Sequence, residues 1–272
     1  MLLSSFTSLQ QRVISALVLA PVAVAALYFG GFYFLLFLIG ASAVMSYEWC
    51  HASLEKSPGL ITLMTAVTVF SGLYVAQKSY FHHGVIALFI GSALIGIAAI
   101  VVKKRNRLGW AISGPLCIGL PVLALISLRS IPDSGFALTL GLFLVVWATD
   151  IGAYFSGKSI GGPKIAPAIS PNKTWAGLIG GIIFAMIVAY LVNRYLVGGQ
   201  VATIGILGLG AICAILAQIG DFAESAWKRH FGIKDASNLI PGHGGVMDRL
   251  DGVFLTAPIL MLLIMLVDGI WQ

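Results

Sequence analysis

Long apolar runs dominate the chain from its start to its end, and short polar breaks separate them. The breaks carry turn-forming residues, such as Gly30-Gly31, Pro132-Asp133 and Gly198-Gly199. A helix needs about 20 apolar residues to cross the hydrocarbon core of a bilayer. The pattern therefore predicts an all-α, polytopic integral membrane protein with about nine transmembrane helices, at residues 12–29, 32–51, 60–77, 84–102, 110–128, 136–157, 175–197, 201–222 and 253–270.

Composition supports lipid as the main surroundings of this chain. Of its 272 residues, 59% are hydrophobic and 10% are charged, and its mean hydropathy is +0.99. A water-soluble domain carries about 25% charged residues. The net charge of +6 requires no nucleic-acid partner, because cytoplasmic loops of membrane proteins collect Lys and Arg. The three cysteines lie in or beside apolar runs without a CxxC pair, which favours small buried side chains over disulfides or zinc.

The basic residues predict an orientation. With nine spans and a cytoplasmic N-terminus, only Lys78, Arg129 and Arg194 of the 16 Lys and Arg residues fall outside. This bias is the positive-inside pattern, and it places two polar loops, about 158–174 and 223–252, on the cytoplasmic side. We expect one polytopic domain over 1–272, with N-terminal spans at 1–135 and spans carrying the polar loops at 136–272. The first span also resembles a secretory signal peptide, but its long apolar stretch favours a retained helix.

Acidic residues gather where predicted spans meet the cytoplasmic boundary. Asp221 and Glu224 end the eighth span, and Asp248 and Asp251 precede the ninth, each pair at a spacing that shares one helix face. Asp150 lies near the cytoplasmic end of the sixth span. Ionisable groups near membrane depth are costly, so they tend to be functional.

Clustered carboxylates repel one another unless cations balance them. Mg²⁺ suits such a cluster, because it prefers carboxylate oxygens and keeps waters or substrate phosphates as its other ligands; a second cation is compatible with this many acids. The alternative from spacing alone is a network in which the acids pair with basic residues of the same loop, namely Lys228, Arg229, Lys234 and Arg249.

Basic and small residues indicate an anion beside the acids. The segment 164–175 combines Lys164 and Lys173 with a Ser-Pro-Asn turn at a predicted helix N-terminus, where free N–H groups favour an anion. The PGHGG segment, 241–245, allows close backbone approach to a ligand. His243 within it is a candidate for binding phosphate or moving a proton, and its alternative role is a local hydrogen bond in a turn.

One motif is misleading. Gly152 to Ser159 satisfies the P-loop pattern, which requires a strand before it and a helix after it in an α/β sheet. Here a predicted transmembrane helix runs through its first half, so we expect no P-loop. Lys158 remains a candidate phosphate contact, and Tyr154 lies one turn from Asp150 on the same face.

A family resemblance rests on residues 225–251, S-A-W-K-R-x4-K-D-A-S-x2-I-P-G-H-G-G-V-M-D-R-L-D, on residues 147–181, and on the Glu48-Trp49 pair. These segments resemble the phosphatidate cytidylyltransferases, or CDP-diacylglycerol synthases; Trp227 departs from the aliphatic residue or Phe usual there. The resemblance implies a bacterial cytoplasmic-membrane enzyme with its active site facing the cytoplasm. Its implied reaction transfers CMP from CTP to phosphatidic acid, releases pyrophosphate and requires Mg²⁺.

The resemblance also implies roles for individual residues. Asp221, Asp248 and Glu224 are expected to hold metal. A second group is expected to bind phosphates or act beside the metal: Lys173, Lys228, Arg229, Lys234, Asp235, His243 and Asp251. A third group is expected to line the substrate site: Ser170, Asn172, Lys158, Lys164, Asp150, Tyr154, Gly244, Gly245 and Arg249.

Other function classes remain open from the sequence. An ion-coupled transporter would use buried acids, although no internal repeat is found. A CTP-dependent lipid-alcohol kinase, or a cytidylyltransferase for another lipid phosphate, would use similar groups. The CDP-alcohol phosphotransferase motif DG-x2-AR is absent, because VFLT follows Asp251-Gly252. We expect membrane lipid as a partner, a homodimer through apolar spans as a compatible assembly, and no nucleic acid.

Overall fold

The computed structural model describes residues 8–54, 59–199 and 201–268, and they form mainly long α-helices. Within these ranges, seven helices are long and apolar enough to cross a membrane, and residues 13–29 and 253–267 form shorter apolar helices. Large apolar side chains such as Val101, Ile204 and Val267 are 74 to 83% exposed, as lipid-facing residues are. The prediction of a polytopic all-α membrane protein is confirmed at this level. The count of nine spans and the orientation stay predictions.

The chain divides into two compact units, and it passes between them three times. The first unit contains the chain up to Ser130 and the segment His230–Leu250, and the second contains Ile131–Arg229 and the chain from Asp251 onward. The hydropathy pattern did not predict that the polar segment before the last helix belongs with the N-terminal helices. The prediction of one polytopic domain stays a prediction.

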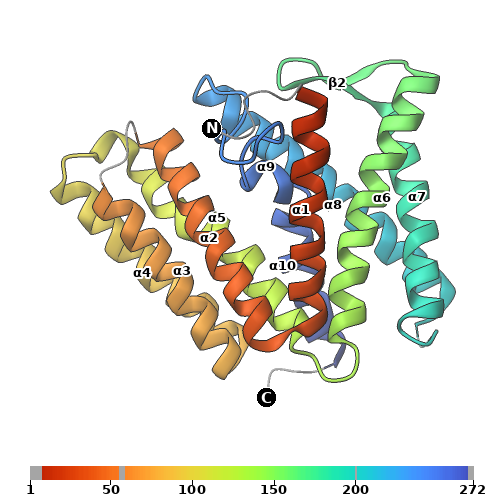
Figure 1. Ribbon diagram of the computed structural model, residues 1–272, viewed down its shortest axis with the longest axis horizontal. Helices are drawn as coiled ribbons and strands as arrows, with labels where there is room; N and C mark the ends of the chain where they lie inside the picture. The colour runs from red at the N-terminus through yellow and green to blue at the C-terminus, as the bar shows by residue number, and fades with distance from the viewer. Residues whose placement is uncertain (1–7, 55–58, 200, 269–272) are drawn as a thin grey trace. The chain divides into compact units, whose positions relative to one another are not determined.

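In the first unit the helices between residues 31 and 129 pack side by side (Figure 1), and a polar loop is folded onto them. The loop begins at an aromatic cluster. The centre of the Trp110 ring lies 5.0 Å from the centre of the Phe231 ring and 5.9 Å from that of Trp49. Trp49 also donates from Nε1 to the Trp110 carbonyl over 2.9 Å. The elements of this unit are α1 (Ser8–Phe29), α2 (Gly31–Ser53), α3 (Gly59–Lys78), α4 (Phe81–Val101), η1 (Arg105–Arg107), α5 (Leu108–Arg129) and α9 (Met247–Leu250).

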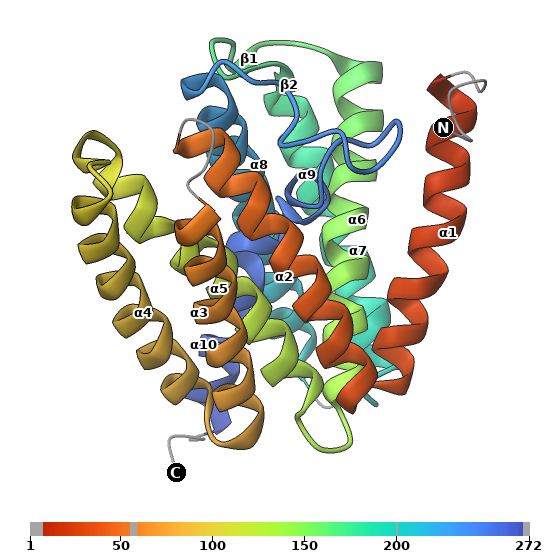
Figure 2. The ribbon, with the colours of Figure 1, turned by 60° about the vertical axis from the view of Figure 1, so that its left-hand side comes forward.

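The second unit packs α6 and α7 closely along their length, with a small hairpin joining them at one end (Figure 2). Glycines allow the approach, because a Cβ on Gly152 would lie 2.8 Å from the Gly180 carbonyl oxygen. The small side chains Ala185 and Ala214 are fully buried in the core shared with α8. The elements are α6 (Gly135–Ile160), β1 (Lys164–Ala166), β2 (Ser170–Thr174), α7 (Trp175–Tyr195), α8 (Thr203–His230) and α10 (Val253–Asp268).

Two local predictions need correction. Helix α8 continues to His230, eight residues past the expected end at 222, because Trp227 is buried and Lys228 pairs with Glu224 one turn away. The predicted Ser-Pro-Asn turn is instead part of β2, which pairs with β1 in an antiparallel hairpin.

The rejection of a P-loop is confirmed, since residues 152–159 lie wholly within α6.

Two glycines of α8 give a matched test of helix packing. A Cβ on Gly210 would lie 2.9 Å from the Ala189 Cβ and 3.0 Å from the Ala185 carbonyl of α7, whereas Gly208 has open space around it. We expect Gly210→Val to lower the free energy of unfolding by about 1–3 kcal/mol through overpacking. Thermal unfolding in detergent measures the loss, with Gly208→Val as the control for helix propensity. Equal stability of the two variants would contradict the packing described for this face of α8.

Candidate functional site

Three carboxylates of the second unit converge on one point. Asp221 and Glu224 lie three residues apart on α8, and Asp251 lies two residues before the start of α10. Each offers an oxygen, and these oxygens all lie within 4.8 Å of one another. Carboxylate oxygens at this separation form a donor set that suits a hard divalent cation such as Mg²⁺. The predicted pairing of Asp221 with Glu224 is therefore present, and Asp251 completes the cluster.

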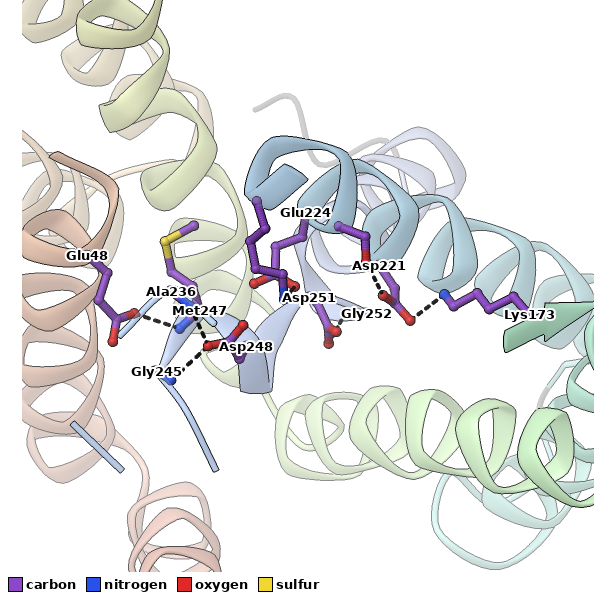
Figure 3. Close-up of polar contacts among 12 residues, drawn as sticks. Glu48, Lys173, Asp221, Glu224, Ala236, Gly245, Met247, Asp248, Asp251 and Gly252 are labelled. Carbon is purple, nitrogen blue, oxygen red and sulfur yellow. Dashed lines mark hydrogen bonds and ion pairs between the residues drawn. The ribbon is translucent and has the colours of Figure 1, made fainter. Parts of the chain in front are cut away.

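A lysine from the hairpin contacts the first of these acids. Lys173 lies on β2, and its ammonium group forms an ion pair with the Asp221 carboxylate (Figure 3). The same ammonium lies 4.3 Å from the centre of the Phe222 ring, a distance that gives a cation–π contact. Ser225 donates to the other Asp221 oxygen over 3.3 Å. The hairpin thus delivers a cation to the acidic face of α8.

The second acid is buried beside its own partner. Glu224 is only 5% exposed, and its Oε2 lies 3.2 Å from Nζ of Lys228, one helical turn later. Such i,i+4 pairs are neighbours on a helix surface. Burial reduces solvent screening of this pair, so Lys228 offsets the negative charge that Glu224 adds to the cluster.

The third acid depends on a glycine for its position. Asp251 accepts a hydrogen bond at Oδ1 from the Gly252 N–H over 2.8 Å. A Cβ on Gly220 of α8 would overlap the Asp251 carbonyl oxygen. The turn before α10 therefore comes close to α8 because position 220 has no side chain.

The first unit builds a different carboxylate site, around Asp248. This side chain is 7% exposed, and its Oδ2 accepts two backbone hydrogen bonds of 2.8 Å, from Ala236 and Gly245. Gly244 has φ +81°, and a Cβ there would lie 2.7 Å from the same oxygen. The loop is thus folded around Asp248, which gives Gly244 a structural role apart from the predicted substrate contact. The metal role of Asp248 stays a prediction.

Sequence reasoning assigned no role to Glu48, which lies in the last turns of α2 and is fully buried. It accepts hydrogen bonds from Ser237 Oγ over 2.6 Å and from the backbone N–H groups of Val246 and Met247, each over 2.9 Å. The criterion that selected Asp150, an ionisable group at the end of an apolar run, would also have selected Glu48.

The remaining predicted residues lie in three places. On α6, Lys158 Nζ lies 3.5 Å from the Tyr154 hydroxyl, and both side chains are exposed, as is Asp150. On the hairpin, Lys164 and Asn172 are exposed and Ser170 is partly buried. The α7 N-terminus forms as predicted, but Thr174 Oγ1 accepts the Gly177 N–H, so that donor is already used. In the polar loop and at the end of α8, Lys234, Asp235, Arg229 and Arg249 are exposed, whereas His243 is partly buried and Gly245 is buried.

Comparison with known proteins extends over nearly the whole chain. The sequence profile of the Cytidylyltransferase family matches residues 10–267. The chain belongs to this cytidylyltransferase family. The match includes both compact units and all residues of the two carboxylate sites.

Relatives of this cytidylyltransferase are similar over full length. A protein of Brucella suis named phosphatidate cytidylyltransferase is 39% identical over 260 residues, covering 94% of this chain and 93% of the relative. Proteins of the same name from Haemophilus influenzae and Bacillus subtilis are 36% and 30% identical, and the alignments cover 92% and 95% of this chain and 96% and 98% of the relatives.

The acidic cluster of this cytidylyltransferase is expected to bind a divalent cation without substrate. Asp251→Asn removes one charge from three convergent carboxylates, so we expect Mn²⁺ affinity to fall about tenfold or more. Electron paramagnetic resonance of free Mn²⁺ during titration of the purified protein measures the change. Asp133→Asn is the control, because Asp133 is an exposed acid outside the cluster and Asn tolerates its φ of 59°. Unchanged Mn²⁺ binding in Asp251→Asn would refute the cluster as the ion site.

Proposed function

We propose that this protein is a CTP:phosphatidate cytidylyltransferase, an enzyme of phospholipid biosynthesis that produces CDP-diacylglycerol and pyrophosphate. The observation that carries this proposal is full-length similarity to bacterial proteins of that name. Apolar helices provide surroundings for a lipid substrate, and the polar end of α8 with the hairpin and the turn before α10 carries the acids and lysines that a nucleotide with metal requires.

The reaction is a displacement at phosphorus. A phosphate oxygen of phosphatidic acid forms a bond to the α-phosphorus of CTP, and the bond from that phosphorus to the α–β bridging oxygen breaks. Pyrophosphate leaves with the bonding electrons. The attacking phosphate is already anionic near neutral pH, so the protein needs no strong general base. The main requirement is to bring two polyanions together, which positioned cationic groups accomplish.

We propose that Asp221, Glu224 and Asp251 hold Mg²⁺. Their oxygens are close enough to share one ion, and all are hard donors. When bound, Mg²⁺ supplies charge neutralisation and orientation for phosphate oxygens. A second cation and a metal role for Asp248 belong to the same proposal, on the strength of the family resemblance.

Two lysines of the second unit have phosphate-binding roles in this proposal. Lys173 is held against Asp221 and the Phe222 ring, so its ammonium group is already ordered beside the acids. Lys228 is ordered in the same way by Glu224. An ordered cation loses less conformational entropy when it binds an anion than a freely moving lysine does. Ser170 and Asn172, from the same hairpin as Lys173, are assigned to the substrate site.

The polar loop of the first unit contributes further groups to the proposal. Lys234, Asp235 and His243 are assigned phosphate-binding or proton-transfer roles from the family resemblance. Arg229 and Arg249 are assigned as additional phosphate contacts, and Lys158, Lys164, Asp150 and Tyr154 as substrate contacts. Each assignment rests on sequence.

We propose that the protein lies in a bacterial cytoplasmic membrane with nine spans, a cytoplasmic N-terminus and a cytoplasmic active site. The bias of Lys and Arg between alternate segments supports this orientation. The bacterial sources of the relatives support the choice of membrane. The homodimer compatible with the apolar spans stays a prediction.

The proposal predicts a specific activity. Purified protein in detergent, given CTP, Mg²⁺ and phosphatidic acid, is expected to release pyrophosphate and form CDP-diacylglycerol, identified by mass spectrometry. Chelation of Mg²⁺ is expected to abolish the reaction, and Asp221→Asn is expected to slow it at least about a hundredfold. Transfer of phosphate in place of CMP would identify a kinase, and absence of any CTP turnover would remove the proposed activity.

The metal assignment has its own test, in which Asp221→Asn and Asp248→Asn are measured in parallel. Wild-type Mg²⁺-dependent turnover in both variants would remove the assignment of these two residues to metal.

The hairpin lysine provides a second test. Lys173→Gln removes the positive charge while keeping a polar side chain of similar length, so we expect kcat/KM for CTP to fall about a hundredfold. Lys78→Gln is the matched control, because Lys78 ends α3 and has no proposed role in the reaction. Steady-state pyrophosphate release measures both variants. A loss in Lys173→Gln no greater than that in the control would show that Lys173 does not act on the nucleotide.

A further inference from the structure

We propose that Glu48 is a positioning residue whose carboxylate sets the conformation of the polar loop 236–248. Its contribution to turnover rests on the proposed function, whereas its contribution to the loop does not. Glu48 is fully buried near the end of α2, and the loop lies about 190 positions later in the chain.

Three hydrogen bonds lead from the loop to this one side chain. Oε1 accepts from Ser237 Oγ over 2.6 Å and from the Val246 N–H over 2.9 Å. Oε2 accepts from the Met247 N–H over 2.9 Å (Figure 3). Hydrogen bonds to a charged acceptor are roughly twice as strong as neutral ones. Glu48 therefore fixes both ends of the segment between Ser237 and Met247.

Glu48 and Asp248 divide consecutive backbone donors between them. The N–H of Gly245 points to Asp248, and those of Val246 and Met247 point to Glu48. A buried N–H without an acceptor costs about 1–3 kcal/mol of stability in general, so the direction of this stretch of backbone depends on both carboxylates. The side chain of Asp248 is thereby held in one orientation.

The glycine at 245 reflects the same constraint. A Cβ there would overlap the Glu48 carboxylate, so any larger residue would push the loop away from α2. Close backbone approach was predicted for this position, with a substrate as the expected neighbour. The neighbour in the structure is Glu48.

A carboxylate fits this place better than an amide of the same shape. The loop presents donors to both Glu48 oxygens, whereas a glutamine has one acceptor oxygen and an NH₂ group that is itself a donor. In Glu48→Gln, the NH₂ group takes the place of one of the two oxygens. It then faces either the Met247 N–H or the donors of Val246 and Ser237, and no hydrogen bond forms between two N–H donors. The substitution nearly keeps the volume of the side chain, and it changes both its charge and the match of donors and acceptors.

The test combines local hydrogen exchange with kinetics. In Glu48→Gln, we expect amide exchange in peptides covering 236–248 to rise about tenfold or more, with exchange in α3 and α4 unchanged. We expect kcat/KM for CTP to fall about tenfold to a hundredfold. Ser46→Ala is the control: Ser46 is also fully buried in α2, but its hydroxyl donates to Ser42 within the helix. If Glu48→Gln does not fold, Ser237→Ala removes one of the three bonds and is expected to shift both measurements in the same direction.

The outcomes distinguish the loop from the fold and from the proposed activity. Exchange that rises evenly through α2 to α5 would mean that Glu48 supports the helices in general, and would overturn the inference. Unchanged exchange in the loop would overturn it too. A loosened loop with unchanged kinetics would overturn the contribution of Glu48 to turnover and leave its role in the loop standing. If the wild type does not turn over CTP, the proposed function fails, and the exchange measurements alone decide whether Glu48 positions the loop.

Discussion

A carboxylate near the boundary of a hydrocarbon core must receive hydrogen bonds or a cation, because its desolvation is otherwise too costly. This constraint organises the polar parts of both units. In the first unit, backbone N–H groups of the loop supply Glu48 and Asp248. In the second unit, lysines supply Asp221 and Glu224. Each unit thus builds its conformation around negative charge, one with amide donors and the other with ammonium groups.

The two solutions differ in what they leave for a substrate. Each backbone N–H that binds Glu48 has one hydrogen and none left for a substrate. Glu48 therefore acts on the conformation of the loop. An ammonium group has three donors and one full charge, so Lys173 can hold Asp221 and still attract an anion. The family resemblance grouped the residues of both units as one set of site residues. Their local partners differ: backbone N–H groups fix the carboxylates Glu48 and Asp248, whereas lysine side chains pair with Asp221 and Glu224.

Much of this arrangement was predictable, because hydropathy and helix spacing are local signals. Runs of about 20 apolar residues located the helices, and the i, i+3 spacing placed Asp221 and Glu224 on one face. The end of α8 was wrong, since the residues after 222 are polar and only burial of Trp227 and the Lys228 pair reveals that the helix continues. The contact of Glu48 with the loop around Gly245 could not be predicted, since it joins segments almost 200 positions apart, although the place of Glu48 in an apolar run was a usable signal. Composition likewise carries no sign that residues 230–250 join the N-terminal helices.

The length of α8 has a consequence for its setting in lipid. Its 28 residues span about 42 Å at a rise of 1.5 Å per residue, whereas the hydrocarbon core is about 30 Å thick. The excess lies at the end from Asp221 to His230, which is mostly polar, so bilayer thickness sets how far this end protrudes. Asp221 and Glu224 are fixed to this end, so their depth relative to the lipid headgroups follows the thickness of the membrane. Acyl-chain length in the surrounding bilayer thereby becomes a physical variable that acts on the acidic cluster.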